Sequence, residues 1–114
     1  MTPSGRDPAD LLPLTTPVYH VLVALADEEQ HGYAIIKTVA RQTAERVMLS
    51  TGTLYGIIKR LLADGLIREI GASGDDRRRS YALTPFGKGV ARAEAARLER
   101  TIALARRKPL FRRS

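Results

Sequence analysis

The segment 50–84 constrains the fold of this 114-residue chain more than any other stretch. Its first part places apolar residues at the three- and four-residue spacing of a helix face, and Gly65 follows as a helix stop. The runs 66–70 and 79–83 then predict a strand pair, and in the second of them Tyr81 and Leu83 alternate with Ser80 and Ala82, as in a half-buried strand. The connection 71–78 is polar and contains a glycine, which is typical of an exposed turn. A helix followed by a β-hairpin is therefore the expected centre of the fold.

The helix at the start of this segment has two unlike faces. On a helical wheel one side gathers the apolar residues Leu54, Ile57, Ile58, Leu61 and Leu62. The other side carries Gly52, Thr53, Gly56, Lys59 and Arg60, with Tyr55 at the boundary. Two glycines on an exposed helix face weaken a helix by about 1 kcal/mol each. One explanation is that side chains there would obstruct the close approach of another surface.

Three further helices are expected. Thr16 is the expected N-cap of the first, because a proline follows it at the first helical position. The second runs over about 31–42, and the third, described above, is capped by Ser50 or Thr51. The last follows a second Thr-Pro start signal and covers about 85–107. The short apolar run 47–49 is interpreted as a strand that pairs with the hairpin.

The order helix, helix, helix, hairpin, helix matches a winged helix-turn-helix with a long C-terminal helix, which is a mainly α fold with a small β-hairpin (α+β). The expected parts are a flexible N-terminal arm (1–14), the winged helix-turn-helix domain (15–84), a C-terminal helix (85–108) and a basic tail (109–114). Three leucines near the end of the arm are placed to pack either on the body or on a partner chain, and the sequence leaves both open.

The charge balance indicates the class of partner. The formal net charge is +7 and the isoelectric point is near 10.4, so the surface attracts nucleic acid first and anionic membrane second. The chain has no cysteine, which excludes disulfides, thiolate catalysis and cysteine-bound metals. Its two histidines show no spacing of a metal site or a nucleophile with its base, so we expect no enzyme and no cofactor. Without a recognisable signal peptide or membrane span, a cytoplasmic location is expected.

The third helix of a helix-turn-helix enters the major groove of DNA, where small polar and basic side chains meet base edges and phosphates. The candidate DNA-binding residues on it are Ser50, Thr51, Thr53, Tyr55, Lys59 and Arg60. Hydroxyl groups serve phosphate or base, and the two cations are suited to hold the DNA backbone. On the second helix, Tyr33 and Lys37 are candidates for a backbone contact. A merely solvated helix face is the alternative interpretation.

Three arginines, residues 77–79, end the loop of the predicted hairpin. Because strand alternation points successive side chains to opposite faces, the three cannot all serve one contact. Arg77 and Arg78 are the candidates for contact with phosphate or the minor groove. The alternative is a salt-bridged hairpin tip.

The last helix carries a narrow apolar seam with spacings of four, three, four and three residues, made of Ala91, Ala95, Leu98, Ile102 and Ala105. Such a seam is typical of two helices that pack along their lengths. A helix of about 34 Å is long for so small a body to cover. An intermolecular seam, and hence a homodimer, is therefore favoured over a helix that lies on its own core.

Three motifs carry a resemblance to a known family: His31-Gly32-Tyr33 with Ile35-Ile36, the run LSTGTLYGIIKRLLADGLI over 49–67, and RRRSYALTPFG over 77–87. In these motifs the chain resembles the PadR family of bacterial transcriptional regulators, over about residues 22–92. Gly56 stands where many members carry proline. The short single C-terminal helix is similar to that of the small subfamily, in which this helix forms the dimer.

The resemblance implies a homodimer that binds double-stranded DNA at an inverted-repeat operator and usually represses transcription. Members respond to phenolic compounds, drugs or other small molecules, and some have no known effector, so the effector of this chain is unidentified. The small drug-binding members stack flat ligands on a tryptophan at the dimer interface. This chain has no tryptophan, and its nearest aromatic substitutes are Tyr19 and Phe86.

Two functions of other classes stay open at this point. The chain could be a dimeric protein-interaction module whose winged helix contacts another regulator instead of DNA. A membrane-surface role of the basic C-terminal segment is less favoured, because an alanine-rich narrow seam would anchor poorly. Specific DNA binding predicts preference for a palindromic duplex and loss of affinity as salt rises, whereas a protein-interaction module predicts neither.

Overall fold

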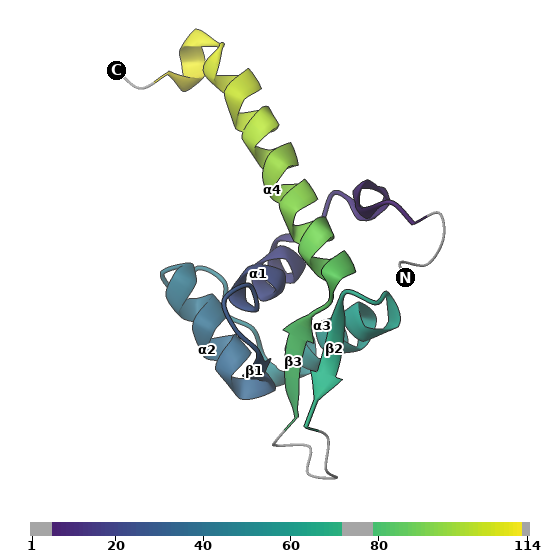
Figure 1. The fold of residues 1–114 in the computed structure, drawn as a ribbon. Coiled ribbons are helices and arrows are strands. Elements are labelled where there is room, and N and C mark those ends of the chain that lie inside the picture. The colour runs from purple at the N-terminus through teal and green to yellow at the C-terminus, as the bar shows by residue number, and fades with distance from the viewer. Residues whose placement is uncertain (1–5, 72–78, 113–114) are drawn as a thin grey trace.

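The structure is a computed structural model that describes residues 6–71 and 79–112. Within these residues the chain forms four α-helices, a small sheet and two short 3-10 helices, in the expected order of a winged helix-turn-helix with a long C-terminal helix (Figure 1). The elements are η1 (Pro8–Leu11), α1 (Thr16–Ala24), β1 (Gln30–His31), α2 (Gly32–Gln42), α3 (Thr51–Ala63), β2 (Ile67–Ile70), β3 (Ser80–Leu83), α4 (Pro85–Arg106) and η3 (Pro109–Phe111).

Each α-helix begins where a side chain accepts the backbone N–H three residues ahead, and these caps are Thr15, His31, Ser50 and Thr84. The expected cap Thr16 is wrong by one residue. Thr16 is already helical, and Pro17 still lies in the first turn, where its missing N–H leaves no bond unmade. At the other end of α3, Gly65 adopts a φ of 74°, which confirms it as the stop.

The sheet has the strand order β1-β3-β2 and is antiparallel throughout. Ile67 lies opposite Leu83 on one side of β3, and Gln30 lies opposite Tyr81 on the other. The expectation that residues 47–49 form the third strand is wrong, because they are a loop that leads into α3. The third strand is β1, which is polar and two residues long, too short for any alternation to show in the sequence.

The core lies where α1, α2 and α3 meet the sheet and the first turns of α4. Leu22, Ile35, Leu54 and Leu61 are among its fully buried side chains. On α3 the buried positions are those that the helical wheel predicts, and Ile57 is partly buried beside them. The outward side of α3 is thereby left to solvent.

The C-terminal helix α4 starts on the body and then leaves it. The Oγ1 of Thr84 donates to the carbonyl of Gly65 at 2.6 Å, and the Thr84 N–H donates to the carbonyl of Leu66 at 3.1 Å. Val90 is fully buried, but the later turns stand clear of the body (Figure 1). After α4 the described part of the basic tail forms η3, and Arg112 folds back to donate to the carbonyl of Arg107 at 3.1 Å.

The segment expected to be a loose arm over 1–14 is packed in its described part, residues 6–14. Leu11, Leu12 and Leu14 are half-buried against the core cluster, and η1 lies along α4. The sequence left these leucines open between the body and a partner chain. Burial of apolar surface on the chain's own body is what holds them here.

Candidate nucleic-acid interface

The outward face of α3 presents an open surface of small, polar and basic residues. Thr51, Thr53, Lys59 and Arg60 are exposed on it together with Gly52 and Gly56. A Cβ on either glycine would meet nothing within 4 Å, so neither glycine is required by packing inside the protein. The structure therefore confirms the two-faced helix and leaves the two glycines without an internal reason.

The first turn of α3 is organised by Ser50. Its Oγ accepts the N–H of Thr53 at 3.1 Å and donates to the Oγ1 of Thr53 at 2.9 Å. The Ser50 hydroxyl is thus used as a cap, while Thr51 carries an exposed hydroxyl beside it. The N–H groups at a helix start attract anions, so the turn is also suited to a phosphate.

Tyr55 lies between α3 and α2 and is 42% exposed. A Cβ on Gly32 would lie 2.5 Å from the Tyr55 hydroxyl oxygen, so the glycine of the His-Gly-Tyr motif makes room for this ring. On α2, Tyr33 is exposed and the Nζ of Lys37 lies 4.7 Å from the centre of its ring. Tyr55 thus lies against the start of α2, the helix that also carries Tyr33 and Lys37.

The far end of α3 approaches the N-terminal segment. Arg60 lines a hollow of about 210 Å³ together with Leu14, Val18 and Asp64. Lys59, one residue earlier on α3, is exposed. Of the two cations on α3, Arg60 is the one nearer the protein's own N-terminal segment.

Of the three arginines at the end of the hairpin loop, the structure describes one. Arg77 and Arg78 lie outside the described residues. Arg79 is described, and its Nη1 lies 3.6 Å from the Oε1 of Glu69 on the neighbouring strand. Arg79 is thereby engaged within the hairpin, as expected if successive arginines face different sides.

The seam on α4 divides into two parts. Ala91 and Ala95 are half-buried, and Ala91 packs against the core cluster. Leu98 and Ile102 are 37% and 51% exposed, and they line a shallow surface hollow. Ala105 is half-buried near the helix end. The part of the seam beyond the body is therefore apolar surface that the chain itself does not cover.

Both histidines make hydrogen bonds within the protein. The Nδ1 of His31 accepts the N–H of Ala34 at 3.3 Å as the cap of α2, as expected for a capping residue. The carbonyl of His20 accepts from the side chain of Gln42 at 2.9 Å. Among residues 6–71 and 79–112, no three His, Cys, Asp or Glu side chains gather as a metal site would need. Within the same ranges no helix is both long and apolar enough to cross a bilayer.

Comparison with known proteins decides the family. The model of the transcriptional regulator PadR-like family matches residues 21–93, which is more than half of the chain. The chain belongs to the PadR-like family of transcriptional regulators. This confirms the resemblance carried by the sequence motifs, and the family is one of transcriptional regulators, not of enzymes.

Two curated proteins are related to parts of this PadR-like chain. The HTH-type transcriptional regulator TtmR of Methylorubrum extorquens is 36% identical over 77 residues, which is 68% of this chain and 36% of TtmR. An uncharacterised transposon protein of Streptomyces fradiae is 40% identical over 80 residues, which is 70% of this chain and 22% of that protein. The chain thus spans well under half the length of either relative.

Solved structures share the fold. A transcriptional regulator from Clostridium thermocellum superposes with a TM-score of 0.69 at 25% identity, over 81% of this chain and 91% of that one. A PadR family regulator from Eggerthella lenta gives 0.68 at 27% identity, over 87% and 84%. Bacillus subtilis PadR in complex with operator DNA gives 0.58 at 23% identity, over 75% and 48%. The winged helix-turn-helix is therefore the fold of the family as well as of this chain.

Sequence reasoning missed a polar contact that links α1 and α2 through Gln30. The Nε2 of Gln30 donates to the carbonyl of Ala24 at 2.6 Å, and its Oε1 accepts from the Oγ1 of Thr38 at 2.8 Å. One glutamine thereby ties α1, β1 and α2 together. No periodicity marks it, and its place directly before the His-Gly-Tyr motif is the one signal that could have found it.

Proposed function

We propose that this PadR-like regulator is a homodimer that binds an inverted-repeat operator in DNA and represses transcription there. The observation that carries the proposal is the outward face of α3, with Thr53, Gly56 and Lys59 exposed and no Cβ at the glycine to hold another surface away. The major groove admits an α-helix, and a helix face of small and basic residues allows close approach to the bases and phosphates.

In this proposal the α3 face enters the groove, and cations around it hold the backbone. Lys59 supplies charge on α3 itself, and Lys37 and Tyr33 approach the phosphates from α2. The hydroxyls of Ser50, Thr51 and Thr53 cluster at the helix start, where the free N–H groups favour a phosphate. Tyr55, Arg60, Arg77 and Arg78 complete the proposed contact set.

The proposed dimer forms through α4. Leu98 and Ile102 are exposed in the protomer on a helix that has left the body, and apolar surface of this kind is stabilised when a second copy covers it. Ala91, Ala95 and Ala105 continue the seam. In such a dimer the two α3 helices lie about 34 Å apart, one turn of DNA, and the two-fold symmetry of the dimer makes the operator an inverted repeat.

The cytoplasm, which holds the chromosome in bacteria such as those of the relatives, is the proposed location. A small-molecule effector is part of the proposal without an assigned site. The ring of Phe86 is half-buried and has the Arg6 guanidinium carbon 4.1 Å from its centre, so it does not offer an open stacking face. Tyr19 is also half-buried.

Selection of bound duplexes from a random pool tests this proposal. We expect enrichment of one inverted repeat, and binding that weakens steeply as salt rises. Enrichment of an unpaired half-site would contradict the dimeric arrangement. No enrichment, with affinity equal for all duplexes, would contradict specific binding and favour the protein-interaction module. Glu28→Ala is a suitable control, because it removes a charge from an exposed turn and Glu28 is not one of the proposed contact residues.

A further inference from the structure

Residues 6–14, which we call the N-terminal strap, connect the end of α3 with α4. In the proposed function, α3 enters the DNA groove and α4 forms the dimer. The η1 turn of the strap lies along α4, and Pro8 packs over Gly89 so closely that a Cβ there would lie 3.3 Å from the proline Cγ. The strap therefore runs along the helix proposed to form the dimer, close to where that helix leaves the body.

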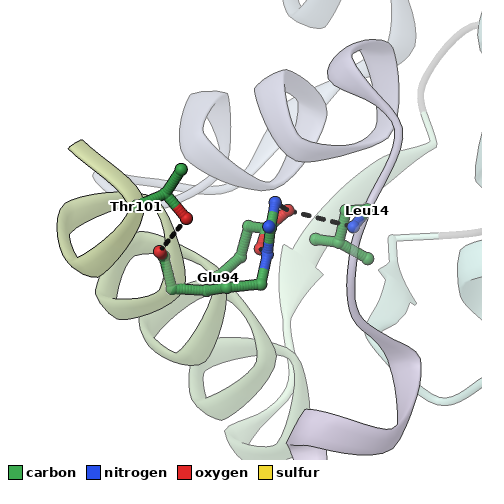
Figure 2. A network of polar contacts seen from close by, with 4 residues as sticks. Leu14, Glu94 and Thr101 are labelled. Atoms are coloured by element: carbon green, nitrogen blue, oxygen red, sulfur yellow. Dashed lines mark hydrogen bonds and ion pairs between the residues drawn. The ribbon is translucent and has the colours of Figure 1, made fainter. Parts of the chain in front are cut away.

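Both ends of the strap are held by polar contacts. At its start, the Arg6 guanidinium donates to the carbonyl oxygen of Asp64, the C-cap of α3, and lies over the ring of Phe86 in the first turn of α4. At its end, the backbone N–H of Leu14 donates to the Oε2 of Glu94 at 3.0 Å (Figure 2). The strap thus joins the end of α3, the helix proposed to enter the major groove, to the middle of α4.

Glu94 is the unusual member of this arrangement. It is 2% exposed, and it is the one charged side chain in the core among the described residues. Its Oε1 accepts from the Nε of Arg97 at 2.5 Å, and its Oε2 accepts from the Nη2 of Arg97 at 3.2 Å and from Leu14. The carbonyl of Arg97 in turn accepts from Thr101 at 2.9 Å (Figure 2). The Arg97 guanidinium and the Leu14 N–H keep the pKa of Glu94 below its ordinary value, despite the opposing effect of burial.

A buried carboxylate is a weak source of stability, because its desolvation offsets most of the attraction to its partners. The three hydrogen bonds of the Glu94 carboxylate instead fix its position relative to the strap and to α4. An apolar side chain at position 94 could fill the same space without holding the Leu14 N–H. The choice of a carboxylate therefore fits a positioning role.

The first turns of α4 are fixed to the body independently of Glu94. A Cβ on Gly87 would overlap the carbonyl oxygen of Leu66, and the same carbonyl accepts the N–H of Thr84. Val90 is fully buried in the core, but beyond this residue a helix without a further contact acts as a lever. For the part of α4 after Val90, about 24 Å long, a swing of roughly 10° moves the far end by about 4 Å. A second fastening further along the helix limits that swing.

We propose that Glu94 is a positioning residue that, through the strap, sets the direction of α4 and so the spacing between operator half-sites that the dimer accepts. This rests on the proposed function, in which α4 forms the dimer. With the direction of α4 fixed, the two α3 helices keep one separation. Without it, the dimer accepts inverted repeats of several spacings.

The test measures the affinity of the full-length protein for a series of inverted repeats whose half-sites differ in separation by single base pairs. The variants are Glu94→Ala, Glu94→Gln and Arg6→Ala, and Glu28→Ala is the matched control for the lost carboxylate. We expect wild type and Glu28→Ala to prefer one spacing. For Glu94→Ala and Arg6→Ala, the ratio of affinities between the best spacing and its neighbours should fall by about threefold or more, since each base pair moves a half-site by roughly 3.4 Å and turns it by about 35° around the DNA axis.

Affinity for an isolated half-site and the sedimentation of the dimer should stay at wild-type values in these variants. Glu94→Gln still accepts from Leu14 but loses the ion pair, so its spacing profile should lie between those of wild type and Glu94→Ala. A folded Glu94→Ala dimer with the wild-type spacing profile would overturn the proposal, even if its melting temperature falls. If Glu94→Ala does not fold, a wild-type profile in both Arg6→Ala and Glu94→Gln overturns it. Absence of duplex binding by the wild type would instead contradict the proposed function itself, and the inference with it.

Discussion

Replacement of Gly56 by alanine should stabilise the protein and weaken its DNA binding at the same time. Gly56 lies inside α3 on its exposed face, and an added Cβ would meet nothing within 4 Å. The substitution therefore gains the helix propensity of alanine, about 0.8–1 kcal/mol, without a steric cost. For a domain of this size such a gain raises the melting temperature by roughly 4 °C.

The effect on binding has the opposite sign if this face enters a groove. A methyl group keeps the DNA surface slightly further away, and the longer side chain of Gly56→Gln obstructs it more. We expect a small loss of affinity for Gly56→Ala. For Gly56→Gln we expect about a tenfold loss, which corresponds to about 1.4 kcal/mol.

Thermal unfolding followed by circular dichroism measures the first effect, at one protein concentration because the stability of a dimer depends on it. Fluorescence anisotropy with the selected operator measures the second. Gly87→Ala is the control of opposite sign, since its Cβ would overlap the Leu66 carbonyl and should lower the melting temperature.

Two results would refute this reasoning. A lower melting temperature for Gly56→Ala would show that the position is not an open helix surface. If both Gly56 variants are stabilised and bind the operator as tightly as wild type, the α3 face does not approach DNA closely.

Three further predictions concern charge, assembly and pH. Lys59→Ala or Arg78→Ala should weaken binding to all duplexes and reduce the salt dependence by about one charge, and an unchanged slope in both would remove them from the interface. Leu98→Glu combined with Ile102→Glu should give monomers by analytical ultracentrifugation, whereas a surviving dimer would place the contact elsewhere. Because the folded pKa of Glu94 is lowered, its carboxylate stabilises the fold above about pH 4.5 and loses this effect as the pH falls through the lowered value. The stability difference between wild type and Glu94→Gln should therefore shrink in acid, and a difference constant between pH 7 and the acid limit of folding would contradict this.

The elements that the sequence predicted well are those decided within a few residues. Ser50 and Thr84 cap their helices because an oxygen and an N–H three residues ahead are enough to make the bond. Gly65 stops α3 because a positive φ favours glycine. The two faces of α3 follow from its period alone. The candidate DNA-binding residues on this helix could be chosen for the same reason, since exposure is set by that period.

The features that sequence reasoning missed depend on partners far along the chain. A two-residue strand such as β1 has no period, and it exists only because β3 offers an open edge to Gln30 and His31. Gly32 also depends on a distant residue. It must lack a side chain because Tyr55, which lies on another helix, occupies that space. Patterns within a segment carry no information on such pairs.

Glu94 shows why a charged residue on a helix is the hardest case for prediction. In sequence it stands beside the seam residue Ala95 and has an arginine three positions later, which is typical of an exposed helical ion pair. Its burial depends on an amide 80 residues earlier, at the end of a segment that the sequence indicated to be loose. This contact between Leu14 and Glu94 is also one of those that hold the N-terminal segment against α4. A cue for such a residue would have been the three leucines at 11, 12 and 14, which require a surface to pack on and so bring the backbone N–H of Leu14 to α4.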